Sequence, residues 1–335
     1  MAGNIVTPQM VADICNSGMM GSIPSGYLTL TNLRTFIKET QRLTSNDFIV
    51  NIFIEPDHPV TEKLAKPHAV RNIEVKLGLP DEDSFIYPAS VPLMDYVDLL
   101  IAMQVRYVST TFGFFNSEIV TKLKAKNIII LATVTSPAEA RFCIANGADG
   151  LILQGQEAGG HQGYFLTNQC GRLSTLELLD SVNRLDLGVP LIVAGGIGIN
   201  DIPKFLSAGA QLIQLGSLFM LTETSGLPHT VKEYICKCTN TSFTKDITGQ
   251  YARGVTNLLM SELVNTLNYT FPIQHYATSR LRKYARDNLL TNYMALWVGK
   301  HANLECNSLN VLLEKIKASC LNYQRCQSSV IIEEH

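Results

Sequence analysis

A glycine-rich segment with a single histidine is the part of this chain best suited to chemistry. Residues 154–163 read Gln-Gly-Gln-Glu-Ala-Gly-Gly-His-Gln-Gly and follow the apolar run 150–153, which predicts a buried strand. Glycines let backbone N–H groups approach a flat or anionic ligand closely. An imidazole in such a loop, here His161, is well placed to be a general base. A tight turn with an incidental histidine is the alternative interpretation.

Two later apolar runs also end in glycines. Residues 189–194 lead into Gly195-Gly196, and residues 210–215 lead into Gly216-Ser217, with a helical pattern after each. A strand, a glycine turn and a helix N-terminus together form an anion site, because free N–H groups and the helix dipole point at it. Two such units in succession predict a phosphate cradle.

The elements that position these turns alternate between strand and helix. Seven short apolar strands are expected near residues 20, 50, 108, 130, 152, 192 and 213, which is typical of a covered parallel sheet. Polar residues or glycines end nearly every strand, which favours a barrel over an open sheet with one glycine fingerprint. The predicted fold is α/β, a (β/α)8 TIM barrel, of which seven strands can be identified in the sequence.

The chain divides into a barrel and an added part. Residues 1–221 are predicted to form the barrel domain, completed by a C-terminal helix at about 301–326. Residues 222–300 show helical segments without a clear strand and predict a helical subdomain on the substrate side. Residues 56–91 are rich in proline and charge and are expected to be irregular. Residues 327–335 are expected to be a tail.

Composition excludes several classes of protein. The 335 residues carry a formal net charge of −2 without a basic run, so nucleic acid is not an expected partner. No apolar stretch is long enough for a membrane span, and no signal-peptide pattern opens the chain, so we expect a cytoplasmic protein. The cysteines and histidines lack paired ligand spacing, so no metal site is expected. We expect a monomer or homodimer acting on a small molecule.

These motifs resemble the nitronate monooxygenase family, formerly called 2-nitropropane dioxygenases. The resemblance runs in order along nearly the whole chain and is most specific around His161. Family members usually begin with a strand that is absent here, which implies that the first strand of the barrel is the missing one. Either the start of the sequence has been placed too late or the protein is truncated. A truncated barrel would have an open seam between the strands near 20 and 213. The matching segments are Met1-Ala2-Gly3, Asn51-Ile52-Phe53, 154–163, 194–198, 214–217, 248–254, 271–274 and 296–300.

The resemblance implies an FMN-dependent barrel with an inserted helical part that closes over the flavin. It implies oxidation of alkyl nitronates, such as propionate 3-nitronate, by O2 to a carbonyl compound and nitrite. His161 would be the catalytic base or would orient the substrate. The residues that would bind FMN, the last six at its phosphate, are Met1, Ala2, Gly3, Asn51, Gln154, Gly159, Gly195, Gly196, Gln214, Leu215, Gly216 and Ser217.

Two other functions stay open at this point. One is an FMN- and NADH-dependent reductase of the enoyl-acyl-carrier-protein or quinone type, which shares the barrel and most glycine motifs. The other is a truncated, catalytically inactive flavin-fold protein. Three residues near these motifs have simpler interpretations: Glu157 is expected in structural hydrogen bonds, Trp297 in the core, and Arg253 either at a ligand or within the helical part.

Overall fold

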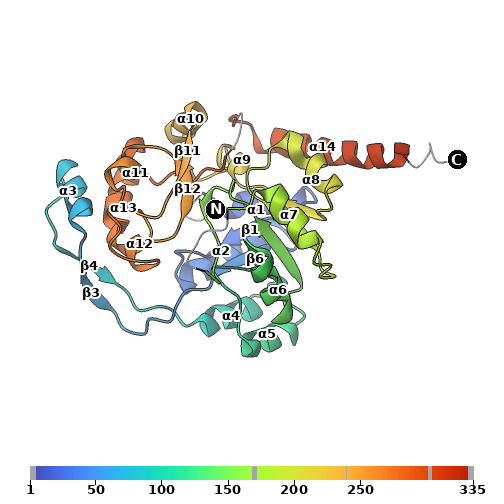
Figure 1. Ribbon diagram of the computed structural model, residues 1–335, viewed down its shortest axis with the longest axis horizontal. Coiled ribbons are helices and arrows are strands. Elements are labelled where there is room, and N and C mark those ends of the chain that lie inside the picture. Colours follow the sequence, from blue (N-terminus) through green and yellow to red (C-terminus); the bar gives the residue numbers. More distant parts are fainter. Residues whose placement is uncertain (1–4, 168–171, 239, 301–303, 331–335) are drawn as a thin grey trace.

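A computed structural model describes residues 5–167, 172–238, 240–300 and 304–330, the side chains of 322–330 excepted. Two lobes make up these residues (Figure 1): a curved parallel sheet with its helices, and a smaller lobe drawn in light blue and orange. The lobes meet at one end of the sheet, where the predicted functional turns lie.

The sheet confirms the predicted α/β barrel-like fold. Its seven strands are all parallel, and the order in the sheet follows the order in the chain. Within the described residues the first and last strands pair with one neighbour each and not with each other, as expected for an open seam. The strands are β1 (Ser22–Pro24), β2 (Ile49–Phe53), β5 (Tyr107–Thr111), β6 (Ile129–Val134), β7 (Gly150–Gln154), β9 (Leu191–Ala194) and β10 (Leu212–Gln214).

Helices pack against the outer face of this sheet. Their apolar residues share a core with outward-facing strand residues such as Val50, Val108 and Ile130, whereas Leu131 and Ile152 form a separate inner cluster. The alternation follows the two-residue period of a strand. The helices are α1 (Pro8–Asn16), α2 (Leu30–Leu43), α4 (Leu93–Ala102), α5 (Ser117–Lys124), α6 (Pro137–Ala145), α7 (Thr175–Asn183) and α8 (Ile202–Ser207), the last preceded by the short η1 (Ile199–Asp201).

The second lobe contains strands that the sequence did not reveal. Its helical parts are α9 (Ser217–Met220), α10 (His229–Lys237), α11 (Leu258–Glu262), α12 (Ile273–Ala277), α13 (Ser279–Asp287) and η2 (Thr291–Tyr293). The expectation of no strand in 222–300 was wrong, because β11 (Thr241–Thr244) and β12 (Ala252–Val255) form an antiparallel pair. Both are four residues long and carry no apolar run, so local patterning did not show them. The partner of β12 on its other side is β8 (Gly160–His161), so the functional loop belongs to this small sheet.

Residues 62–87 also belong to the second lobe. The segment expected to be irregular holds β3 (Glu62–Ala65), α3 (His68–Lys76) and β4 (Ser84–Tyr87), with β3 and β4 antiparallel. Val70 and Ile73 of α3 share a buried cluster with Leu281 and Ala285 of α13. This insertion between β2 and α4 therefore supports the face of α13 opposite the barrel.

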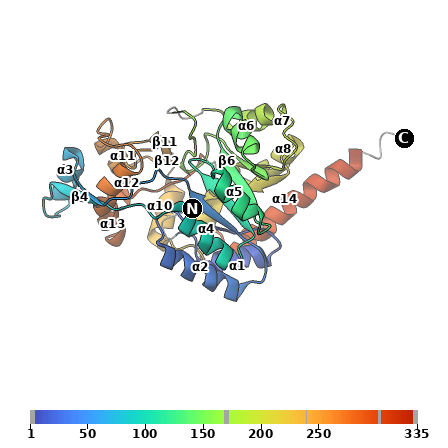
Figure 2. The ribbon, with the colours of Figure 1, turned by 90° about the horizontal axis from the view of Figure 1, so that it is seen from below.

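The final helix, α14 (Leu309–Val330), returns to the barrel. Leu309, Leu312 and Ile316 enter the barrel core, and the Ser319 hydroxyl donates to the carbonyl of Ile199 at 2.8 Å. The helix continues past the predicted end and its far part projects from the body (Figure 2). Among the described residues no helix combines the length and apolarity that a membrane crossing requires.

Candidate active site

A cavity of about 1930 Å³ extends from the barrel interior, where it reaches the first residues of strands such as Tyr107 and Ile129, to the carboxyl ends of the strands beneath the second lobe. Ligand pockets usually occupy about 300–1,000 Å³, so the cavity is larger than a single ligand needs. The predicted site residues that line it are Gln154, Gly159, His161, Gly195, Gly196, Gln214, Leu215, Gly216 and Ser217. Three sequence motifs separated along the chain therefore meet around one space.

Gln154 fixes the histidine loop from the end of β7. Its side-chain Nε2 donates to the carbonyl of His161 at 2.9 Å, and its Oε1 accepts from the N–H of Gly163 at 2.7 Å. Both ends of one amide are used to hold the loop on either side of the imidazole. Gln154 therefore positions His161, in addition to lining the cavity.

The imidazole of His161 lies among aromatic rings and is neutral. Its ring centre is 5.6–5.8 Å from those of Phe112, Phe271 and Trp297. Burial first, and the positive charge of Arg282 second, lower the pKa of His161 from 6.5 to about 3. Nε2 lies 2.9 Å from the hydroxyl of Thr248, whereas Nδ1 has no hydrogen-bond partner within the described residues. One ring nitrogen is thus fixed and the other is available to a ligand.

The glycine turns after β9 and β10 form a wall that a side chain would disrupt. Gly195 and Gly196 have φ of 111° and 66°, in the left-handed region that favours glycine. A Cβ on Gly196 would lie 2.3 Å from Cβ of Glu157. The N–H groups of Gly195, Gly196 and Gly216 find no acceptor in the part of the chain that the structure describes. Unpaired donors at a cavity wall suit an anion such as a phosphate.

Residues 296–300 cross over these turns and are held by them. The N–H of Gly299 donates to the Ser217 hydroxyl at 3.0 Å, and the N–H of Lys300 donates to the Glu157 carbonyl at 2.8 Å. A Cβ on Gly159 would lie 2.4 Å from the Gly299 nitrogen, so close approach of the two backbones requires glycine there. Trp297, expected in the core, packs against the second lobe and also lines the cavity.

The side chains of Glu157 and Arg253 make structural hydrogen bonds. The Glu157 carboxylate accepts from the N–H and the hydroxyl of Thr175 at 3.0 and 3.1 Å, which confirms its structural interpretation. Arg253 donates through Nε to the Gln156 carbonyl at 3.0 Å and lies over the ring of Phe243. Both side chains thus tie the histidine loop to its surroundings.

The remaining predicted contacts lie elsewhere. Asn51 donates from Nδ2 to the hydroxyls of Ser109 and Thr111, at 3.0 and 3.1 Å, and does not line the cavity. Its contact with a flavin stays a prediction. Met1, Ala2 and Gly3 lie outside the described residues.

The cavity residues that the sequence interpretation missed include Tyr27, Phe112, His275 and Arg282. The Tyr27 ring stacks on His275 with centres 4.1 Å apart, and Arg282 donates to the His275 carbonyl at 2.8 Å. Tyr27 and Phe112 both have φ of 72°. Left-handed aromatic residues after a strand are an unusual backbone feature, but no local sequence pattern reveals them.

Comparison with known proteins gives a consistent picture. A family model described as nitronate monooxygenase matches residues 1–316. A probable nitronate monooxygenase of Staphylococcus aureus (strain Newman) is 32% identical over 320 residues, covering 91% of this chain and 87% of that protein. The solved structure of a nitroalkane oxidase from Streptomyces ansochromogenes superposes with a TM-score of 0.82 at 29% identity, over 98% of this chain and 95% of that one. FabK from Thermotoga maritima, with a TM-score of 0.73 at 22% identity over 98% and 92% of the two chains, shares the fold.

Proposed function

Because the chain belongs to the nitronate monooxygenase family of flavin-dependent oxidoreductases, we propose that it binds FMN and oxidises alkyl nitronates with O2. The products are a carbonyl compound and nitrite, and propionate 3-nitronate is a representative substrate. The observation that carries the proposal is a neutral imidazole with one open nitrogen beside a cradle of unpaired backbone donors.

The glycine wall fits the proposed cofactor. Gly195, Gly196 and Gly216 offer N–H groups to the FMN phosphate, and Gly159 lines the cavity beside them, held there by its close approach to Gly299. Bound flavin supplies the redox chemistry, while the protein supplies orientation, electrostatics and exclusion of water.

His161 orients the substrate in this proposal. In the tautomer with the proton on Nδ1, the Thr248 hydroxyl turns from the Gln250 carbonyl, 3.3 Å away, to donate to Nε2 at 2.9 Å. Nδ1 then donates to an oxygen of the nitronate. A nitronate is already an anion and needs no base. A neutral nitroalkane must lose an α-proton, for which an imidazole with a pKa of about 3 is a weak acceptor. The site therefore favours the nitronate.

Replacing His161 separates these two roles. Asparagine keeps a hydrogen-bond donor but is no base, so H161N should retain oxidation of preformed ethyl nitronate within about tenfold and abolish any activity on neutral nitroethane. H161A should lose about 10- to 100-fold in kcat/KM on the nitronate as well. Oxygen consumption with each substrate, at equal flavin content, measures both. A nitroethane rate unchanged in H161N would contradict a role for His161 in proton removal.

The pH profile tests the state of the imidazole. Since the pKa of His161 lies far below its ordinary 6.5, the ring takes up no proton between about pH 5.5 and 8. The kcat/KM for a preformed nitronate should therefore show no break near pH 6.5. A break there that disappears in H161N would show that His161 titrates normally and is more hydrated than the structure indicates.

A further inference from the structure

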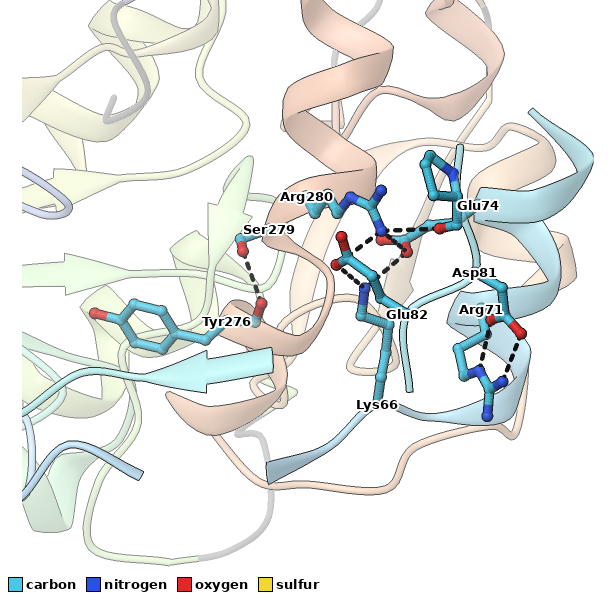
Figure 3. Close-up of polar contacts among 9 residues, drawn as sticks. Lys66, Arg71, Glu74, Asp81, Glu82, Tyr276, Ser279 and Arg280 are labelled. Atoms are coloured by element: carbon cyan, nitrogen blue, oxygen red, sulfur yellow. Dashed lines mark hydrogen bonds and ion pairs between the residues drawn. The ribbon is translucent and has the colours of Figure 1, made fainter. Parts of the chain in front are cut away.

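Several positively charged side chains line the cavity, and they differ in whether a carboxylate lies close to them. Arg280, Lys283, Arg286 and Lys317 each lie within 4.0 Å of a carboxylate. Figure 3 shows the first of these pairs, in which Arg280 reaches Glu74 and Glu82. Arg282, also on the cavity wall, has no carboxylate within that distance in the described residues. It is the cavity cation whose charge the surrounding chain leaves unbalanced.

The guanidinium of Arg282 is held by neutral groups. Nε donates to the Thr278 hydroxyl at 3.0 Å, and Nη2 donates to the His275 carbonyl at 2.8 Å and lies 3.0 Å from Nδ1 of that ring. Burial lowers the pKa of His275 well below its ordinary range, so this ring is neutral. Nη1 has no hydrogen-bond partner within the described residues. Keeping a partly buried positive charge with an unpaired N–H donor costs free energy unless an anion binds to it.

An anion bound by Arg282 would lie away from the glycine turns that are proposed to bind the FMN phosphate. Arg282 lies on α13 in the second lobe, whereas the cradle follows β9 and β10 of the barrel. Arg282 and His161 line the same cavity, and the hydrogen bonds of Arg282 go to Thr278 and His275. A substrate with its nitronate at His161 therefore lies in the cavity onto which Arg282 opens.

A rigid support holds α13 in this position. Lys66 and Glu74, with side chains 1% and 0% exposed, pair at 2.8 Å, and Arg280 reaches the same carboxylate at 3.2 Å (Figure 3). Arg280 also donates to the Pro80 carbonyl at 3.1 Å. Arg282 follows Arg280 by two residues on the same helix, so the insertion 62–87 fixes its backbone before substrate arrives.

We propose that Arg282 binds a carboxylate at the far end of the substrate and so determines selectivity for nitronates with a second negative charge. Nη1 donates to one carboxylate oxygen, and the half-buried guanidinium gains the counter-charge that the described residues do not supply within 4.0 Å. This inference rests on the proposed oxidation of nitronates. Arg282 would then determine specificity although it lies outside the glycine and histidine motifs.

Matched substrates test the assignment. Propyl 1-nitronate has a methyl group where propionate 3-nitronate has its carboxylate. In R282Q we expect the KM for propionate 3-nitronate to rise by about 10- to 100-fold with kcat within about threefold, and the KM for propyl 1-nitronate to stay within about threefold. R282K should recover part of the loss. The control is R184Q, which removes an exposed arginine that is already paired with Asp180 and does not line the cavity, and it should change neither KM. Equal effects of R282Q on both substrates, or none, would overturn the assignment.

A binding measurement separates this inference from the proposed function. Trp297 is the single tryptophan of the chain, lines the cavity and lies 5.6 Å from His161, so its fluorescence reports ligands there. Succinate, an unreactive analogue of propionate 3-nitronate, should bind the FMN-loaded wild type and bind R282Q at least about tenfold more weakly, whereas butyrate should not distinguish them. Arg282-dependent succinate binding without nitronate oxidation would overturn the proposed function alone. Nitronate oxidation with succinate binding unchanged in R282Q would overturn the inference alone.

Discussion

Replacing Gly196 by alanine should weaken FMN binding by about a hundredfold or more. The residue has φ of 66°, and a Cβ there would lie 2.3 Å from Cβ of Glu157. Glu157 cannot retreat easily, because its carboxylate holds Thr175 and its carbonyl holds Lys300. Backbone strain of about 1–3 kcal/mol and overpacking of about 1–3 kcal/mol then displace the turn that faces the phosphate.

Gly188 provides the matched control for that substitution. It has a similar φ of 68°, but a Cβ there would meet nothing within 4 Å, and the residue does not line the cavity. G188A should therefore cost stability through strain and leave FMN affinity unchanged. Titration with FMN, followed by flavin fluorescence, and thermal unfolding measure the two effects. If G196A bound FMN as tightly as G188A does, the phosphate would lie elsewhere.

Replacing Lys66 by methionine should destabilise the protein by about 3 kcal/mol or more. The Lys66 ammonium lies 2.8 Å from a Glu74 carboxylate that is fully buried, and the other oxygen of that carboxylate has no partner in the described residues. Without Lys66, only Arg280 at 3.2 Å faces this buried charge. Removing one member of a buried ion pair leaves an uncompensated charge, which costs about 3–5 kcal/mol.

Two further variants identify the cause of that loss. The double variant K66M/E74L removes both charges and should regain much of the stability, because an apolar pair of similar size tolerates burial. K63M, at an exposed position on β3 just before Lys66, should change the free energy of unfolding by less than about 0.5 kcal/mol. Urea unfolding of the four proteins compares them. If K66M matched K63M, the buried network would not support the insertion 62–87.

Local sequence signals predicted the barrel and most of its glycine turns. Thr7 and Ser136 cap helices, with side chains accepting from Met10 and Glu139 backbone N–H groups. Strands such as β6 and β7 were visible because they are buried on both faces and mostly apolar. Helix caps and apolar strands depend on residues that are close in the sequence, so they can be predicted without knowledge of the fold.

The substrate side could not be predicted in the same way. The run 279–287, Ser-Arg-Leu-Arg-Lys-Tyr-Ala-Arg-Asp, has the composition of a solvated helix, yet Arg282 faces the cavity. That placement depends on the packing of residues 62–87 against α13, more than 190 positions away in the chain. The pairing of β8 with β12 likewise joins two short segments that carry no strand signal alone. Contacts between distant segments therefore decide this part of the site.

The visible spectrum of the FMN-loaded protein, recorded before and after anaerobic addition of propionate 3-nitronate, tests the central claim most directly. We predict a bound-flavin spectrum that bleaches with the nitronate and without NADH, which would establish cofactor and substrate class in one experiment. A flavin that bleaches only with NADH would contradict the claim and favour a reductase. Failure to take up added FMN at all would contradict the assignment of the glycine wall as its binding site.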